Sequence, residues 1–516
     1  MQRGGGRVAS RGPHLPDRHG LTLAPEFSRG ALERVTGYPE IAGNAVGLQF
    51  DGPSTFTAWI EAIQSAKRFV HFENYLLRND RVGRRFREVL VEKAREGVQV
   101  RVLYDWIGSW ATPRKYWKPF REAGVEVRAF NRPSVRDPLG VLQRDHRKLV
   151  CVDGTVAFAG GFCLGVEWAG TEEEPPWRDT GLEVRGPAAA HAARAFERIW
   201  SEEGDPVPEE VEADPAATPR AGDCSVWLIE GEPWRARVQR TLQFVAASVR
   251  RRLWITDPYF VAPRSLADAL TAAARQGVDV RILVPANNNW PIVGSLSRGG
   301  YRPLLEAGVR LFEWQGPMIH AKTSVADGMW CRVGSSNLNA ASLLGNWEID
   351  VGVMDASLAG QLEGLFLADL ASSVEIVLPG SRSVHRSDSA GALVPHEPRS
   401  LTPLDPEGTL ASRLEEMIAG GTGIAPLRMA QLLRAGTAFG GALAGRRTLG
   451  REDRTVLGTV SVIVMAVAVV AGLFPGVVGL ALAAGLAWIG VVMGVRAIAH
   501  SRRARVESLP GPGETS

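Results

Sequence analysis

The sequence has little cysteine and none of the common metal or nucleotide motifs. Its four cysteines are scattered over 516 residues without metal-ligand spacing, and we expect buried, reduced thiols. It contains no H-E-x-x-H pair, no acidic triplet at loop spacing and no G-x-x-x-x-G-K-[ST] loop. These absences argue against zinc hydrolases and P-loop ATPases, and we expect a site that uses no metal and no cofactor.

A strong excess of one charge is also missing. The net charge of +3, with 45% hydrophobic and 22% charged residues, is typical of a globular protein. Basic stripes with interleaved aromatic residues are absent, so we expect no nucleic-acid partner. Residues 1–20 lack the apolar core of a secretory signal, and we expect residues 1–40 to form a disordered basic tail.

Charge disappears near the other end of the chain, from Val456 to Val495. Pro475-Gly476 divides this run into two stretches that each approach the ~20 residues of a membrane-spanning helix. We expect a transmembrane hairpin over 455–497, a juxtamembrane helical segment over 408–454 and a cytoplasmic tail over 498–516. Arginines flank the hairpin on both sides, so the positive-inside rule places its flanks in the cytoplasm. The alternative is a buried helical hairpin of a soluble domain.

The region between these ends is internally duplicated. Each half has the order strand, helix, strand, helix, strand, and this alternation predicts α/β lobes with mixed, mainly parallel sheets flanked by helices. The expected lobes span residues 41–202 and 223–378. Proline-rich linkers are expected at 203–222 and 379–407.

Each half carries one copy of the pattern H-x-K-x4-D. The copies are His146, Lys148 and Asp153, and His320, Lys322 and Asp327. On a strand, residues two apart project to the same face, so each imidazole lies beside a lysine. Histidine can act as nucleophile or general acid–base, and lysine can stabilise a phosphate in place of a metal ion. Two converging copies therefore indicate one phosphodiester-handling site.

The duplicated motif resembles the signature of the phospholipase D superfamily, and the sequence is most similar to bacterial cardiolipin synthases. The resemblance covers roughly residues 45–375. Small residues after each motif and several short segments support it. These are Gly160-Gly161, Gly334-Ser335, Glu73-Asn-Tyr75, Trp177-Arg-Asp179-Thr and Gly334-Ser-Ser-Asn337-Leu-Asn339. Two features depart from the family pattern: Cys163 stands where an asparagine is frequent, and the expected membrane hairpin follows the lobes instead of preceding them.

The resemblance also implies roles for individual residues. His146 would form a phosphohistidine and His320 would be the general acid, although the sequence leaves open which histidine attacks. Lys148, Lys322 and Asn337 would bind phosphate, with Ser335 in the same substrate-binding turn. Asp179 and Glu348 would lie at the substrate and orient the two imidazoles, each across the interface between lobes. Asp153 and Asp327 would complete the motifs as structural partners.

The expected function is transfer of a phosphatidyl group between phosphatidylglycerol molecules at the cytoplasmic side of a bacterial inner membrane. The rivals are a phospholipase D that hydrolyses phospholipids to phosphatidic acid, a nuclease of the same superfamily, and a non-catalytic membrane scaffold. The partners expected are a phospholipid and a membrane, and the oligomeric state is left open. Among the tryptophans, Trp106, Trp110 and Trp117 are candidates for an interface with lipid.

Overall fold

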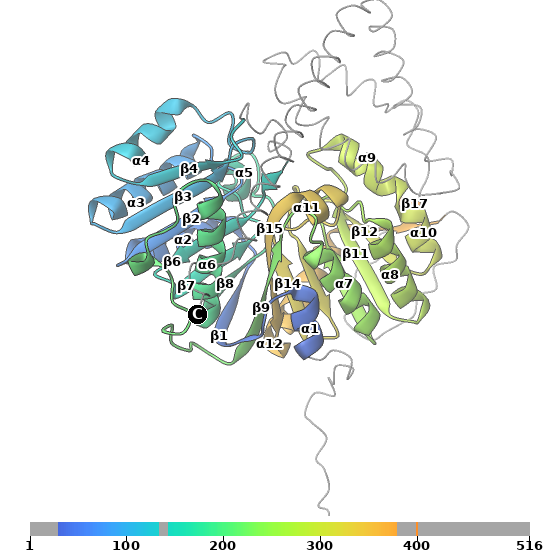
Figure 1. The fold of residues 1–516 in the computed structure, drawn as a ribbon. Coiled ribbons are helices and arrows are strands. Elements are labelled where there is room, and N and C mark those ends of the chain that lie inside the picture. The colour runs from blue at the N-terminus through green and yellow to red at the C-terminus, as the bar shows by residue number, and fades with distance from the viewer. Residues whose placement is uncertain (1–28, 134–142, 379–398, 401–516) are drawn as a thin grey trace, which may run out of the picture.

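The computed structural model describes residues 29–133, 143–378 and 399–400, which form two lobes side by side (Figure 1). A short helix precedes the first lobe, α1 (Arg29–Thr36). The first lobe contains β1 (Ile41–Gln49), α2 (Gly52–Ser65), β2 (Phe69–Asn74), α3 (Arg81–Arg95), β3 (Gln99–Asp105), a 3-10 helix (Arg114–Trp117), α4 (Lys118–Glu122), β4 (Glu126–Phe130), β5 (Arg144–Asp145), β6 (Lys148–Val152), β7 (Val156–Gly160), α5 (Val166–Ala169), β8 (Gly181–Arg185) and α6 (Pro187–Glu202).

The second lobe repeats this order after a connection that contains a 3-10 helix (Glu209–Val211). It contains β9 (Cys224–Gly231), α7 (Arg237–Ser248), β10 (Arg252–Thr256), α8 (Arg264–Arg275), β11 (Asp279–Pro285), α9 (Pro291–Gly299), α10 (Tyr301–Glu306), β12 (Arg310–Trp314), β13 (Thr323–Ala326), β14 (Trp330–Gly334), α11 (Ala340–Gly345), β15 (Asn346–Met354), α12 (Ala356–Ala371), β16 (Ser373–Val377) and β17 (Arg399–Ser400).

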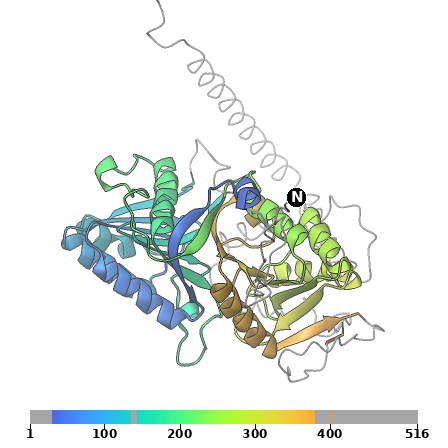
Figure 2. The ribbon, with the colours of Figure 1, turned by 90° about the horizontal axis from the view of Figure 1, so that it is seen from below.

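The strand order of the two lobes is related by a pseudo-twofold symmetry. From the centre outward, the first lobe runs β1-β8-β7-β6-β2-β3-β4 and the second runs β9-β15-β14-β13-β10-β11-β12. The central strands β1 and β9 pair with each other, in antiparallel orientation, through their first residues (Figure 2). The two halves of the duplicated sequence thus form one continuous array of strands.

The sheets are mixed, as expected, but the expectation that they are mainly parallel was wrong. Among the main strands, the parallel pairs are those of β2-β3-β4 in the first lobe and β10-β11-β12 in the second. Beyond β12 the second lobe continues with β16, which is antiparallel to β12, and the short strands β17 and β5 add parallel pairs with β16 and β15. The remaining main strands follow one another as antiparallel neighbours. Short turns join β6 to β7 and β13 to β14, and a turn this short permits only antiparallel pairing.

Successive side chains on a strand point to opposite faces of the sheet, and this divides the hydrophobic core into three clusters. On β6, Val150 and Val152 face an outer cluster with α2 and α3, whereas Leu149 and Cys151 face the opposite lobe. This central cluster contains the inner faces of both sheets together with α6 and α12. The second lobe has its own outer cluster with α7 and α8. The shared central cluster holds the lobes together and positions the residues at their junction.

The expected disordered segment at 1–40 includes residues 29–36, which form α1, and its residues 1–28 lie outside the described residues. Leu32 is fully buried in the outer cluster of the second lobe, and burial of its side chain stabilises the helix there. The linker at 203–222 is also packed, with Val207, Val211 and Ala213 in the central cluster.

The expectations for the C-terminal part fall mostly outside the described residues. The linker at 379–407 is described only at β17, and the juxtamembrane segment, the transmembrane hairpin at 455–497 and the tail lie wholly outside. Within the described ranges, no helix combines the length and apolar character that a bilayer span requires.

Candidate active site

The two motifs lie at equivalent places, around the starts of β6 and β13. Lys148 opens β6 beside β2, and Lys322 directly precedes β13 beside β10, with each histidine two residues earlier. The motifs thus begin at the edge where the parallel strands end, which is where sites gather in open α/β sheets.

Asp153 and Asp327 lie at the opposite ends of these strands. Asp153 is five residues after Lys148, which is about 16 Å along a strand at ~3.3 Å per residue. Each aspartate has a positive φ, 53° and 50°, and is followed by a glycine that also has a positive φ. These residues open the three-residue turns that join β6 to β7 and β13 to β14. The Asp153 carboxylate also accepts hydrogen bonds from the backbone N–H groups of residues 67–69, at 2.8 Å each.

Asp327 repeats this arrangement in the second lobe. Its carboxylate accepts hydrogen bonds from the backbone N–H groups of residues 250–252, at 2.8–2.9 Å. Both aspartates therefore fix the motif strand to the start of its neighbour. The x4 spacing of the motif corresponds to the length of this strand, and neither carboxylate reaches the histidines.

Each histidine is paired with a carboxylate of the other lobe. Nδ1 of His146 lies 3.0 Å from Oε2 of Glu348, and Nδ1 of His320 lies 2.7 Å from Oδ2 of Asp179. Backbone pairing accompanies both contacts: the His146 N–H donates to Trp347 O at 2.9 Å, and the His320 N–H donates to Arg178 O. Each lobe thus contributes one side-chain partner and one backbone partner to the histidine of the other lobe.

The carboxylates are themselves held in place. The Ser335 hydroxyl donates to Oε2 of Glu348 at 2.6 Å, and Ser342 donates to Oε1. Asp179 accepts from the indole N–H of Trp168 at 2.7 Å and from the Thr180 N–H at 2.8 Å. Because these partners fix the oxygens, they also fix the direction of each imidazole.

The surroundings of the two carboxylates differ in charge. Burial raises the pKa of Glu348 to about 7, against the lowering effect of Lys148. Burial also acts to raise the pKa of Asp179, but the charge and hydrogen bond of His320 outweigh it and lower the pKa to about 2. At neutral pH Asp179 is a full anion, whereas Glu348 is divided between its two forms.

The hydrogen bonds at Nδ1 leave Nε2 as the reactive nitrogen of each ring. Nδ1 of His146 also lies 3.1 Å from the backbone oxygen of Ser335, so two acceptors surround it and it carries the proton. Burial and the charge of Lys322 lower the pKa of His320 to about 3. With Asp179 ionised, the neutral His320 ring donates from Nδ1 and presents an unprotonated Nε2.

Two buried lysines supply positive charge between the histidines. Lys148 and Lys322 each donate to the backbone oxygen of the histidine two residues earlier, and Lys322 Nζ lies 3.0 Å from Nδ1 of His320. Burial lowers the pKa of Lys322 to about 8. Lys148 belongs to the first lobe but lowers the pKa of His320 and Glu348 in the second, so the half-sites form one electrostatic unit.

The glycines after each motif leave room for buried aspartates, Asp179 in the first lobe and Asp350 in the second. A Cβ added to Gly161 would lie 2.0 Å from Oδ1 of Asp179, and one added to Gly334 would lie 1.9 Å from Oδ1 of Asp350. Asn337 is 6% exposed, and its Oδ1 has no hydrogen-bond partner among the described residues. Cys163, its counterpart in the first lobe, is buried. Ser335, expected to bind substrate, is buried and donates its hydroxyl to Glu348.

Several neighbours of the site did not emerge from the sequence reasoning as site residues. The ring of Tyr75 packs edge-on against His146 at 4.9 Å between centroids, and Tyr259 packs against His320 at 5.9 Å. Both tyrosines follow equivalent strands, so the duplication itself could have revealed them. Trp168 and Ser342 stand in short helices with no local pattern, and only their long-range contacts identify them. No group of three or more potential metal ligands occurs within the described ranges.

Comparison with known proteins identifies relatives of this chain. The family described as "Cardiolipin synthase, PLD-like domain" matches residues 59–200 and 245–370. Cardiolipin synthase A of Pseudomonas aeruginosa is 36% identical over 369 residues, which are 70% of this chain and 74% of that protein. A cardiolipin synthase of Halalkalibacterium halodurans is 34% identical over 333 residues, 63% of this chain and 66% of that protein.

A solved structure shows the same fold. The phosphatidylserine synthase of Haemophilus influenzae superposes with a TM-score of 0.55 at 16% identity, covering 67% of this chain and 91% of that one. At this identity the likeness concerns the fold alone. The family model and the sequence relatives show that the chain belongs to the cardiolipin synthase-like enzymes of the phospholipase D superfamily.

Proposed function

We propose that this enzyme transfers a phosphatidyl group from one phosphatidylglycerol molecule to another and so produces cardiolipin and glycerol. The observation that supports it most directly is the pair of cross-lobe imidazole–carboxylate contacts around two buried lysines. This arrangement provides two oriented Nε2 atoms and fixed positive charge, which is what successive attack and protonation at one phosphorus require.

In the first step, Nε2 of His146 forms a bond to phosphorus while the bond from phosphorus to the glycerol oxygen breaks. The leaving oxygen takes the proton from Nε2 of His320, and glycerol departs. In the second step, the hydroxyl of another phosphatidylglycerol attacks phosphorus and gives its proton to His320. The P–N bond then breaks, which restores both histidines.

The charge difference between the carboxylates supports this division of roles. An imidazolium is stabilised best beside a full anion, and Asp179 is ionised at neutral pH while Glu348 is only partly so. In the empty site, burial and Lys322 keep His320 neutral. A phosphodiester anion ~4 Å away contributes about 4 kcal/mol at an effective dielectric constant of ~20, enough to move the pKa of His320 toward neutrality.

The lysines bind the non-bridging oxygens in this proposal, and Asn337 adds a neutral contact. Lys148 and Lys322 are fully buried, so their charges act in a medium of low polarity, where they stabilise a developing negative charge strongly. Tyr75 and Tyr259 restrict the access of water to the histidines. Exclusion of water favours transfer to an alcohol over hydrolysis.

The proposal also places the enzyme at a bacterial cell membrane with its lobes on the cytoplasmic side. The uncharged run from 456 to 495 and its arginine flanks support this placement. Extraction of cell membranes with alkaline carbonate would remove a peripheral protein and leave one anchored by the expected hairpin.

The direct test of the function is a product analysis. The purified full-length protein is mixed with labelled phosphatidylglycerol in detergent, with a chelator and without nucleotide. We expect equal amounts of cardiolipin and glycerol. Phosphatidic acid as the main product would identify a hydrolase, and a requirement for CDP-diacylglycerol would identify a different transferase reaction; either result contradicts the proposal.

A further inference from the structure

Large apolar side chains are rarely exposed in the part of the chain that the structure describes. Among the described residues the exposed ones are Phe50, Trp110 and Trp234, at 51%, 40% and 80% of their surface. Of the other two tryptophans expected at a lipid interface, Trp117 is buried and Trp106 is partly buried. The three exposed rings come from different parts of the sequence, so any feature that they share must lie in their position in the fold.

All three rings follow the ends of strands that reach the active site. Phe50 follows β1, whose last residue Gln49 pairs with Gly181, two residues after Asp179. Trp234 follows β9, whose last residue Gly231 pairs with Glu348 itself.

Trp110 follows β3 in the same way. This strand runs parallel to β2, and β2 pairs with Lys148 through its last residue, Asn74. The three aromatic loops therefore lie at the edge of the sheets at which the site is built.

The same loops contact elements that hold the site. The Trp234 N–H donates to Leu344 O in α11, the helix that carries the Glu348 partner Ser342. A Cβ added to Gly108, two residues before Trp110, would lie 2.0 Å from the backbone oxygen of Tyr75.

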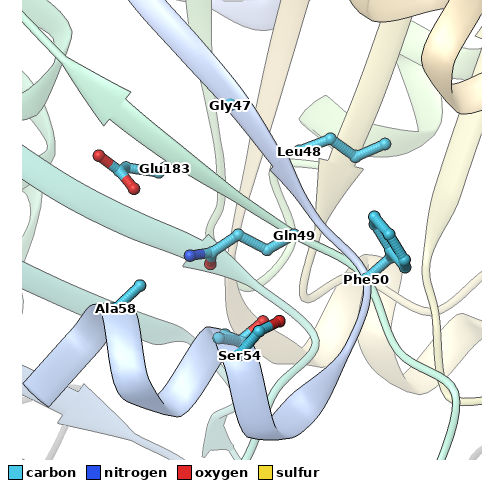
Figure 3. Close-up of a pocket in the computed structure, with 8 residues that line it drawn as sticks. Gly47, Leu48, Gln49, Phe50, Ser54, Ala58 and Glu183 are labelled. Carbon is cyan, nitrogen blue, oxygen red and sulfur yellow. The ribbon is translucent and has the colours of Figure 1, made fainter.

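Phe50 is connected to the site through α5. A Cβ added to Gly52 would lie 1.8 Å from the backbone oxygen of Trp168, the residue that binds Asp179. Figure 3 shows Phe50 where β1 turns into α2, and Phe50 lines a small pocket there together with Gln49 and Glu183.

The backbone at Trp234 is unusual for such an exposed residue. Its φ is +69°, a region that bulky L residues seldom adopt, and Ala236 nearby has a φ of +48°. A strained residue whose side chain is 80% exposed gains little from packing within the protein. The loop therefore holds the indole ring of Trp234 toward the solvent. Contact of this ring with another molecule would account for the strained conformation.

Exposed basic residues are close in sequence to two of the rings. Arg235 and Arg240 follow Trp234, and Arg114 and Lys115 follow Trp110; Arg235 is also paired with Glu232 at 3.0 Å. Aromatic rings with adjacent arginines and lysines are typical of protein surfaces at the interface of an anionic bilayer.

We propose that Phe50, Trp110 and Trp234 dock this edge onto the headgroup layer of an anionic phospholipid bilayer. Docking brings the site to the lipid and lets a phospholipid reach the histidines without crossing bulk water. The inference rests on the proposed function for its substrate, but the contact with the bilayer can be measured without turnover.

The test compares two substrates in the full-length protein. A variant with Phe50→Ser, Trp110→Ser and Trp234→Ser is assayed on vesicles of phosphatidylglycerol and on monomeric short-chain phosphatidylglycerol. We expect turnover on vesicles to fall about tenfold or more, a factor that corresponds to only ~1.4 kcal/mol of binding, and turnover of the monomer to stay unchanged. The matched control changes three exposed residues at the opposite edge, with Lys67→Ser, Thr155→Ser and Gln276→Ser.

A second measurement needs no activity. Vesicles containing brominated phosphatidylglycerol should quench part of the tryptophan fluorescence, and Trp110→Phe with Trp234→Phe should remove that part. Equal loss on both substrates, or no loss on either, overturns the proposal, as does fluorescence that brominated lipid leaves unchanged in the wild type. If neither substrate is consumed but quenching is present, the proposed function fails and the docking proposal stands.

Discussion

Nδ1 of His146 in the first lobe lies 3.0 Å from Oε2 of Glu348 in the second. The contact between His320 and Asp179 crosses the junction in the opposite direction at 2.7 Å. Neither lobe therefore contains a histidine together with the carboxylate that orients it. The duplication produces a working site only when the lobes pack, and the shared central cluster provides that packing.

Loss of the Asp179 charge should abolish most activity without unfolding the protein. In Asp179→Asn the side chain keeps its size but no longer stabilises an imidazolium at His320, and we expect kcat to fall by about 10²–10⁴-fold. The measurement is cardiolipin formation, with circular dichroism to confirm folding. Asp223→Asn, which changes a fully exposed aspartate, is the control and should behave as wild type. Equal activity of the two variants would exclude the proposed role.

The assignment of the nucleophile can be tested with an activated substrate. Phosphatidyl-p-nitrophenol needs no general acid for its first step, because nitrophenolate leaves unprotonated. His320→Ala should therefore release one equivalent of nitrophenolate and then stop, because no base activates the acceptor. Mass spectrometry of the stopped enzyme should show the phosphatidyl group on His146. If instead His146→Ala released the burst of nitrophenolate and the phosphatidyl group were found on His320, the two roles would be reversed.

The sequence predicted the positions of the motifs better than the topology that joins them. The sequence predicted that each histidine and lysine lie on a strand, but only Lys148 does. His146, His320 and Lys322 lie just before β6 and β13, and Lys322 still lies beside His320, at 3.0 Å. The antiparallel pairing of β6 with β7 and of β13 with β14 was not predicted, although Asp153-Gly154 and Asp327-Gly328 are typical signals for a hairpin turn. The alternation of strands and helices favours parallel pairing, but these local turns decide the pairing here.

Other parts of the site could not be predicted from local pattern. The indole of Trp168 binds Asp179, and Ser342 binds Glu348, but each residue lies in a short helix whose position depends on packing of the whole lobe. The pKa of about 7 for Glu348 arises from burial, which becomes visible only when the lobes are assembled.

The pH dependence of kcat/KM should be bell-shaped, with its acidic and basic limbs close together in pH. Glu348, with a pKa of about 7, must ionise to support His146, so activity rises as pH passes through this value. Lys322, with a pKa of about 8, loses its charge at higher pH, so activity falls again. We expect an optimum between these values in the free enzyme. In Glu348→Gln the acidic limb near pH 7 should disappear while the basic limb remains.

Stability should respond to pH through Glu348 as well. Its pKa in the folded protein is raised to about 7, so the unfolded chain releases this proton first as pH increases. Between about pH 4.5 and pH 7 the folded state binds more protons, and this group's contribution to stability is lost as pH rises through that range. Relative to wild type, Glu348→Gln should gain thermal stability from pH 5 to pH 8. A constant difference in Tm across this range would contradict the assignment.

Gly161 should tolerate no side chain at all. A Cβ at this position would lie 2.0 Å from Oδ1 of Asp179, so Gly161→Ala must displace the carboxylate that orients His320. We expect activity to fall at least about 10²-fold, as for a lost acid–base contact, while the protein still folds. Gly364→Ala in α12 is the control, because a Cβ there meets no atom within 4 Å. If both variants retained activity, the close approach of the turn to Asp179 would have no functional meaning.

Asp153 should matter for stability and not for chemistry, although it belongs to the H-x-K-x4-D signature. Its carboxylate accepts three backbone hydrogen bonds at 2.8 Å, far from the histidines along β6. Removing them in Asp153→Ala should lower the free energy of unfolding by about 2–4 kcal/mol, because charged hydrogen bonds are lost and backbone donors are left without partners. Urea denaturation measures this loss, and Asp223→Ala is the control. The kcat of the folded fraction should stay within about twofold of wild type, because the half-site lies beyond reach of this carboxylate. A large fall in kcat at normal stability would instead place Asp153 in the reaction.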